Sequence, residues 1–188
     1  MENKIIIIAL FGGSGSGKDS LKNMVYATVD NVYKIVRCTT RTKRDNETEG
    51  EDYNFLTPEE FAEKVGNGDM LEAVSFNNWF YGTDIHNLKT NGINIGAFDP
   101  FSIECLLKDS RLKVYPFKVE ASDKERLIRA LNREDNPNCQ EICRRYLEDN
   151  KDLCDIPFEY ETLKNETIFD LHENKEFFNH FCKTILTE

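Results

Sequence analysis

The sequence lacks an apolar stretch long enough to cross a lipid bilayer. Its longest apolar run, residues 5–11, is far shorter than the roughly 20 residues that a membrane-spanning helix needs. Only Lys4 precedes this run as a candidate signal-peptide charge, so neither secretion nor a membrane partner is indicated. Repeats and low-complexity tracts are also missing. We therefore expect one cytoplasmic domain of 188 residues, with small appended subdomains at most.

The cysteines do not form a pattern that indicates a metal site. The six are scattered, and they include no C-x-x-C pair and no cysteine and histidine run of zinc spacing. Cys139 and Cys143 lie one helical turn apart, but no second pair accompanies them. We therefore expect reduced thiols and no metal binding by cysteine.

Positive charge is scarce, which argues against a nucleic-acid partner. The 24 Lys and Arg residues are outnumbered by 34 Asp and Glu, leaving a net charge of −10. Proteins that bind nucleic acids usually collect Lys and Arg on one face. The arginines are nonetheless concentrated in residues 37–44 and 126–145. Two such concentrations in an acidic chain indicate either local sites for small anions such as phosphates, or solvated faces.

Strand and helix patterns alternate along the chain, as in an α/β fold with a mainly parallel central sheet flanked by helices. Residues 5–11 are apolar on both faces and predict a buried central strand. The helical spacing of Leu21, Met24 and Val25 predicts a helix after it. Other strands are predicted at 32–38, 93–98, 112–119 and 162–165, with a hairpin of 71–76 and 79–81 around Asn77 and Asn78. Other helices are predicted at 58–65, after Ser122, at 139–153, and at the C-terminus around Phe177, Phe178, Phe181 and Ile185.

A glycine-rich segment follows the first predicted strand. It matches the G-x-x-x-x-G-K phosphate-loop motif and lies between a strand and a helix, as that motif requires. Its backbone N–H groups can turn toward an anion, and Lys18 can reach the β and γ phosphates of ATP. The predicted ATP-binding residues here are Gly12, Gly13, Ser14, Gly15, Ser16, Gly17, Lys18, Asp19 and Ser20.

Asp19 departs from the motif, which has Ser or Thr after the lysine; Ser20 comes one place later. An aspartate at this position could ligate Mg²⁺ directly or through water, or it could repel phosphates if nothing neutralised it. We hypothesise that it helps to hold the metal.

Two later segments resemble the guanylate kinase family at its GMP-binding segment. Residues 39–44 read T-T-R-T-K-R and residues 49–55 read E-G-E-D-Y-N-F, where the family carries T-T-R-x-P-R and then G-x-D-Y-x-F. The resemblance continues through Phe61, Leu71-Glu72 and Tyr81-Gly82-Thr83, so that with the phosphate loop it spans residues 5–83. It implies a P-loop NTPase fold with a core (1–36, 84–121 and 158–188), an NMP-binding subdomain (37–83) and a helical lid (122–157).

The resemblance also implies two sets of acceptor contacts. Arginine forks match phosphate oxygens. A carboxylate can accept the ring N–H and the exocyclic amine of guanine, a donor pair that adenine lacks. The implied phosphate contacts are Arg41, Arg44, Tyr53 and Tyr81, and the implied base contacts are Glu72 and Thr83.

Two departures bear on specificity. Arg37 stands where the family usually has a serine that contacts guanine, and Lys43 replaces the family's proline. Arg37 could donate to a guanine carbonyl or could recognise another base.

Beyond residue 90 the resemblance weakens but stays in order. Asp99 follows the predicted strand 93–98, which corresponds to the family's third strand, and is the only acid at that strand end. It could bind magnesium or order water, or it could cap a helix before Pro100. Arg133 and Arg145 match the family's two lid arginines, although Arg129 and Arg144 lie close enough to confuse the assignment. Asn165 resembles the asparagine near the adenine pocket.

The function that the resemblance implies is phosphorylation of GMP or dGMP, with ATP and Mg²⁺ as cofactors. Lys18, Arg41, Arg133 and Arg145 would be catalytic. The alternatives are a kinase for another nucleoside monophosphate, a P-loop regulatory ATPase, and a catalytically silent module that binds phosphorylated peptides. The expected partners are small nucleotides, and the expected state is a monomer or a homodimer.

Overall fold

The strand β1 (Ile5–Phe11) forms the middle of a five-stranded parallel sheet in a computed structural model that describes residues 4–45, 47–76, 78–133 and 135–187. The strand order is β2-β7-β1-β8-β9, and each neighbouring pair is parallel. The four other strands are β2 (Val32–Lys34), β7 (Ile93–Ala97), β8 (Leu112–Glu120) and β9 (Glu161–Lys164).

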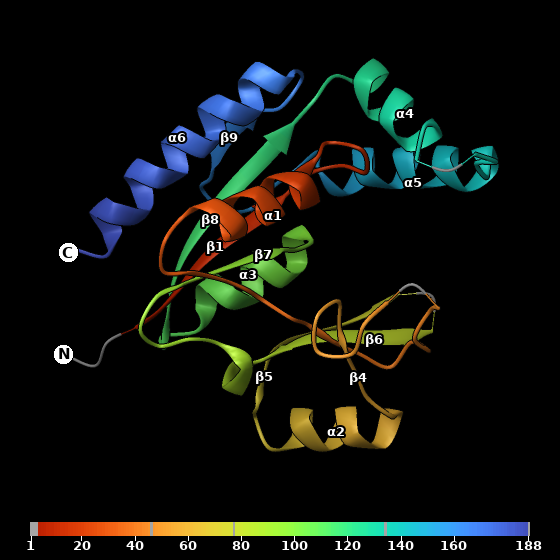
Figure 1. The fold of residues 1–188 in the computed structure, drawn as a ribbon. Coiled ribbons are helices and arrows are strands. Elements are labelled where there is room, and N and C mark those ends of the chain that lie inside the picture. Colours follow the sequence, from red (N-terminus) through yellow and green to blue (C-terminus); the bar gives the residue numbers. More distant parts are fainter. Residues whose placement is uncertain (1–3, 46, 77, 134, 188) are drawn as a thin grey trace.

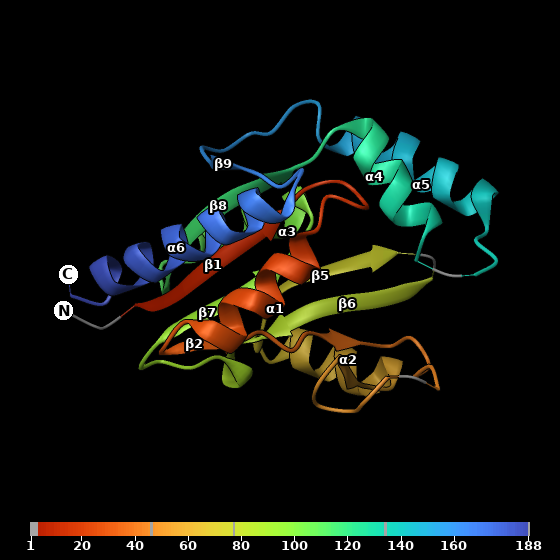
Figure 2. The ribbon, with the colours of Figure 1, turned by 45° about the horizontal axis from the view of Figure 1, so that its top comes forward.

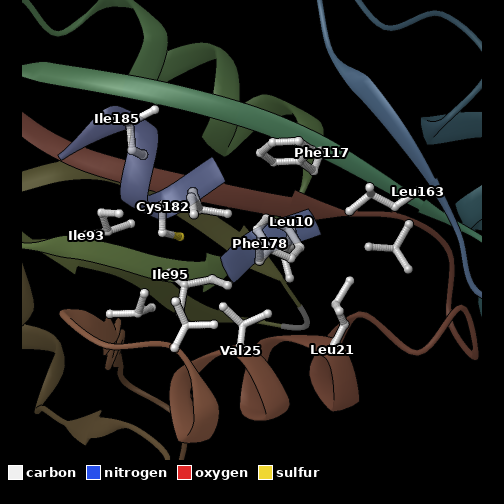
Figure 3. Packing of buried hydrophobic residues seen from close by; sticks show 14 residues of the cluster. Leu10, Leu21, Val25, Ile93, Ile95, Phe117, Leu163, Phe178, Cys182 and Ile185 are labelled. Atoms are coloured by element: carbon white, nitrogen blue, oxygen red, sulfur yellow. The ribbon is translucent and has the colours of Figure 1, made fainter. Parts of the chain in front are cut away.

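Helices cover both faces of this sheet because its strands are apolar on both faces. Successive side chains of a strand point to opposite faces, and Ile8 and Leu10 belong to one buried cluster while Ile7 and Ala9 belong to another. The first cluster packs against α1 (Lys18–Thr28) and α6 (Ile168–Ile185), as the labelled side chains of Figure 3 show. The second packs against α3 (Pro100–Lys108).

A separate four-stranded mixed sheet lies beside the first. Its order is β4-β3-β6-β5, from β3 (Cys38–Thr39), β4 (Asn54–Phe55), β5 (Met70–Phe76) and β6 (Trp79–Asp84). The 3-10 turn η1 (Ile85–Asn87) follows β6. The helix α2 (Pro58–Gly66) begins with a capping box in which Thr57 and Glu60 satisfy each other's backbone N–H groups.

The helices α4 (Asp123–Leu131) and α5 (Cys139–Asp152) form a hairpin after β8. In Figures 1 and 2 this hairpin and the small sheet both lie away from the two chain termini. They flank the phosphate-loop end of β1, which is where a ligand of a parallel α/β sheet usually binds.

The expected α/β fold is confirmed, as are the β5–β6 hairpin and the C-terminal helix. Asn77, predicted to be part of the hairpin turn, lies outside the described residues, and Asn78 has a left-handed φ of 65°. The predicted strand 32–38 is wrong in extent. Ile35 still donates to Ile95 of β7, but the Arg37 carbonyl accepts from Asn54, so the chain changes sheets between them. Across the described ranges, no helix is long and apolar enough to span a membrane.

Candidate functional site

The loop between β1 and α1 has the backbone of an anion site. Gly12 and Gly17 have φ values of 147° and 87°, which other residues rarely adopt. A Cβ on Gly12 would lie 2.4 Å from the Val119 carbonyl oxygen, and one on Gly17 would lie 2.2 Å from Asn165 Nδ2. Gly17 also leaves the first turn of α1 without a side-chain cap. The N–H groups of that turn therefore remain available to a ligand.

Lys18 begins α1 and its amine turns back over the loop. Nζ lies 3.3 Å from the Gly13 carbonyl oxygen. Burial lowers the pKa of the Lys18 amine, and the nearby carboxylates of Asp19 and Asp149 oppose that effect. A half-buried ammonium group over a loop that borders two cavities is suited to binding a phosphate.

A carboxylate of the protein itself occupies an anion position in this loop. The backbone N–H of Ser14 donates to Asp149 Oδ2 at 2.5 Å, and Arg126 Nη2 lies 3.3 Å from the same oxygen. Arg126 also donates from Nε to the Ser14 carbonyl at 3.1 Å, and its side chain is buried. Sequence reasoning missed Asp149, because a single acid on a helix carries no motif.

Two other side chains support the loop from behind. Arg129 Nη1 contacts the Gly15 and Ser16 carbonyls at 3.4 Å, and its Nη2 donates to the Glu166 carbonyl at 2.9 Å. Asn165, the predicted adenine-pocket residue, is buried and donates to the Ser16 carbonyl at 2.8 Å. These contacts hold the loop in shape; the adenine role of Asn165 stays a prediction.

Asp19 projects from the first turn of α1, where it pairs with Lys22 at 2.9 Å. Burial alone would raise the pKa of the Asp19 carboxyl, but Lys22, Lys18 and Arg133 together lower it, so the group remains ionised. Ser20 lines the cavity beside it. Among the described residues, no group of three or more His, Cys, Asp or Glu side chains could hold a metal.

Arg41 follows β3 in the chain, is buried, and forms a fork with Glu47. Nη2 lies 2.6 Å from Oε1 and Nη1 lies 3.0 Å from Oε2. Hydrogen bonds from Arg41 lower the pKa of the Glu47 carboxyl. The guanidinium also lies over the ring of Tyr53, whose centroid is 6.0 Å from that of Tyr81. The structure thus brings together Arg41, Tyr53 and Tyr81; Arg44 is exposed and donates its backbone N–H to Glu47 at 2.9 Å.

Glu72 is the centre of a buried polar cluster. Its carboxylate accepts hydrogen bonds from Arg37 Nη2 at 2.9 and 2.8 Å and from the Thr83 hydroxyl at 2.7 Å. The Ser102 hydroxyl, which sequence reasoning missed, lies 3.1 Å from Glu72 Oε2. The predicted base contacts Glu72 and Thr83 therefore do lie together with Arg37, but these three side chains bind one another.

Asp99 caps α3. Its Oδ1 accepts from the Ser102 N–H at 2.9 Å and its Oδ2 lies 2.6 Å from the Ser102 hydroxyl. The structure therefore shows the helix cap that was one of the two alternatives. Asp99 also lines a cavity of about 1020 Å³, which we call the main cleft. Its metal role stays a prediction.

Two cavities at the phosphate loop are lined by Lys18. The larger, of about 1020 Å³, extends from Lys18 and Asp19 to Arg37, Tyr53 and Tyr81. The smaller, of about 320 Å³, lies between the loop and the α4–α5 hairpin and is lined by Arg133 and Arg145. Arg145 lines both cavities.

Arg144 and Arg129, the two neighbouring arginines, have other contacts. Arg144 pairs with Glu141 and Glu148 and is absent from the lining of both cavities. Arg144 and Arg145 together lower the pKa of Glu141 to about 2 through hydrogen bonds. Arg129 holds the loop backbone. Of these four arginines, Arg133 and Arg145 line a cavity at the phosphate loop, and their catalytic role stays a prediction.

Comparison with known proteins identifies similar chains. The family model described as "Guanylate kinase" matches residues 2–96. A guanylate kinase of Salinibacter ruber is 28% identical over 158 residues, which cover 79% of this chain and 84% of that enzyme. A guanylate kinase of Thermotoga maritima is 42% identical over 83 residues, covering 44% of this chain but only 39% of that enzyme. The alignment with Thermotoga therefore spans less than half of the relative's length.

A solved structure agrees over the full chain. The guanylate kinase of Anaplasma phagocytophilum superimposes with a TM-score of 0.69 and covers 100% of this chain and 89% of its own. At 17% sequence identity, this likeness establishes the fold.

Proposed function

Because the chain belongs to the guanylate kinase family, we propose that it transfers the γ-phosphoryl group of ATP to the phosphate of GMP or dGMP. The observation that carries the proposal is the main cleft of about 1020 Å³, which is lined both by Lys18 of the phosphate loop and by Tyr53 and Tyr81 of the acceptor segment. A donor and an acceptor phosphate bound at these two ends would face each other in one space.

In this proposal, three regions of the chain have different roles. The core (1–36, 84–121 and 158–188) binds ATP, the NMP-binding subdomain (37–83) binds the acceptor, and the lid (122–157) closes over the phosphates. Closure would exclude water, which competes with the acceptor for the phosphoryl group. We also infer that the protein acts in the cytoplasm, as a monomer or a homodimer.

The reaction needs positioning and positive charge rather than a general base, because the attacking phosphate oxygen is already an anion at neutral pH. In-line attack on the γ-phosphorus spreads charge over the transferring group. Lys18 would bind the donor phosphates, Arg41 and Arg44 the acceptor phosphate, and Arg133 and Arg145 the transferring group. The acceptor phosphate would take the place at Arg41 that the Glu47 carboxylate now occupies.

Magnesium fits this site. Mg²⁺ is usually bound by one or two carboxylates together with phosphates and water, and Asp19 and Asp99 both line the main cleft. When bound, the ion would neutralise charge on the phosphate oxygens. Asp19 remains ionised, as a ligand must be.

The test is ADP formation from Mg·ATP with all ribo- and deoxyribonucleoside monophosphates as acceptors. We expect turnover with GMP and dGMP. Lys18→Ala should reduce that turnover by about 10²–10³-fold, the usual loss when one preorganised donor is removed. Absence of turnover with every acceptor, in protein that binds a phosphorylated peptide, would support the silent module instead.

A further inference from the structure

Arg37, rather than Glu72, faces the acceptor cleft. The side chain of Glu72 is 0% exposed and that of Arg37 is 15% exposed. Arg37 lines the main cleft, whereas Glu72 is absent from its lining. A base entering this cleft would therefore meet the guanidinium before the carboxylate.

The Glu72 carboxylate has little capacity left for a ligand. A carboxylate offers about four lone-pair sites. Oε1 accepts from Arg37 Nη2 and the Thr83 hydroxyl, and Oε2 accepts from Arg37 Nη2 and lies 3.1 Å from the Ser102 hydroxyl, whose single proton is shared with Asp99. The ring N–H and exocyclic amine of a guanine would have to displace a buried ion pair to reach it, which would leave a buried charge without its partner.

Arg37, in contrast, has donors to spare. All of the side-chain hydrogen bonds that Arg37 makes with described residues use Nη2. Nε is buried and has no hydrogen-bond partner in the described part of the chain. A buried donor without a partner is unfavourable, so a small movement of the side chain that gives Nε an acceptor would be stabilising.

The guanidinium is also held in place beside flat apolar walls. The ion pair with Glu72 fixes one side of it, and the ring of Phe98 lies 5.3 Å from Cζ. Ile35, Phe98 and Phe101 line the same cleft. An oriented arginine fork in an apolar slot is suited to two adjacent acceptors on the edge of a planar ring.

Resting on the function proposed above, we propose that Arg37 is the specificity-determining residue and that the acceptors are 6-oxopurine nucleotides, hypoxanthine as well as guanine. Arginine pairs with the O6 and N7 acceptors of guanine, and hypoxanthine presents the same two atoms. Adenine presents a 6-amino donor toward the arginine and is rejected. The 2-amino group, which distinguishes guanine from hypoxanthine, finds no free carboxylate and contributes little.

The experiment compares kcat/KM for GMP, IMP and AMP. In the unmodified protein, we expect GMP and IMP to differ by less than about tenfold, because the 2-amino group meets no unpaired buried group. Arg37→Ser removes the ion pair and opens Glu72 to the base. The preference for GMP over IMP should then rise by about 10- to 100-fold, since hypoxanthine would leave the carboxylate partly unpaired.

Two further variants separate base recognition from other effects. Arg44→Ser removes an arginine proposed to contact the phosphate, and should weaken GMP and IMP equally. Arg37→Lys keeps a cation beside Glu72 but loses the fork, so it should lower activity with both nucleotides without raising the preference. Thermal unfolding of each variant shows whether it is folded. The ratio of kcat/KM for GMP to kcat/KM for IMP in the unmodified protein tests the proposal even if a variant does not fold.

Failure of this proposal is distinct from failure of the function. Turnover of GMP with more than about 100-fold rejection of IMP would overturn the role of Arg37 and leave the kinase activity standing. Absence of turnover with every nucleotide would overturn both.

Discussion

Replacing Asp149 with asparagine should tighten ATP binding. Asp149 Oδ2 accepts the Ser14 N–H at 2.5 Å, within the loop that is proposed to bind phosphates. A donor phosphate that uses this N–H must first displace the carboxylate. Asparagine has the same shape but no charge, so it would compete less well with the phosphate and would not repel it.

The expected size follows from the bonds that must break. A hydrogen bond to a charged group contributes about 1.5–3 kcal/mol and a neutral one about 0.5–1.5 kcal/mol. The difference of roughly 1–1.5 kcal/mol corresponds to a dissociation constant lower by about 5- to 12-fold. Loss of the repulsion between carboxylate and phosphates acts in the same direction, so about fivefold is a lower bound. Arg126 keeps Asn150 at 3.2 Å and Asp123 at 3.4 Å, so the fold should survive.

The assay is calorimetric titration of ATP at fixed ionic strength, with thermal unfolding as a check on folding. Asp155→Asn is the matched control, because it removes the same charge from an exposed position just after α5. We expect the control to change the dissociation constant by less than about twofold, since exposed charges are screened. Unchanged or weaker ATP binding by a folded Asp149→Asn variant would refute the displacement argument.

Three other predictions concern turnover, metal and stability. Arg133→Ala and Arg145→Ala should each lower kcat far more than they weaken GMP binding, and equal losses would contradict a role confined to the transition state. Asp19→Ser should shift the magnesium concentration needed for half-maximal turnover; an unchanged magnesium dependence would remove Asp19 as a ligand. Phe178→Ala should destabilise the protein by about 3–5 kcal/mol in urea unfolding, because Phe178 is 0% exposed. Phe169→Ala, on the same helix but 76% exposed, should cost far less, and similar losses would be inconsistent with the core described.

Local sequence patterns were sufficient for the family, the α/β fold and most elements. The apolar run of β1 and the glycines after it are contiguous, so their chemistry can be recognised without knowledge of the fold. The capping box at Thr57 and the apolar spacing of α6 are local in the same sense. The sheet change between Ile35 and Arg37 was missed because β-rich composition continues through it while its hydrogen-bond partners change.

The state of the candidate site was decided by contacts between residues far apart in the chain. Arg37 and Glu72 are 35 positions apart and Ser14 and Asp149 are 135 apart. The residue types of Arg37, Glu72 and Ser14 predicted a base pocket and a phosphate loop, whereas Asp149 was missed. Only the packing of the small sheet and the α4–α5 hairpin against the larger sheet showed that these groups bind each other. By itself the sequence determined which chemistry is present, because motifs and periodicity are local. The tertiary structure decided which donors remain free, because pairing depends on distances that no local pattern encodes.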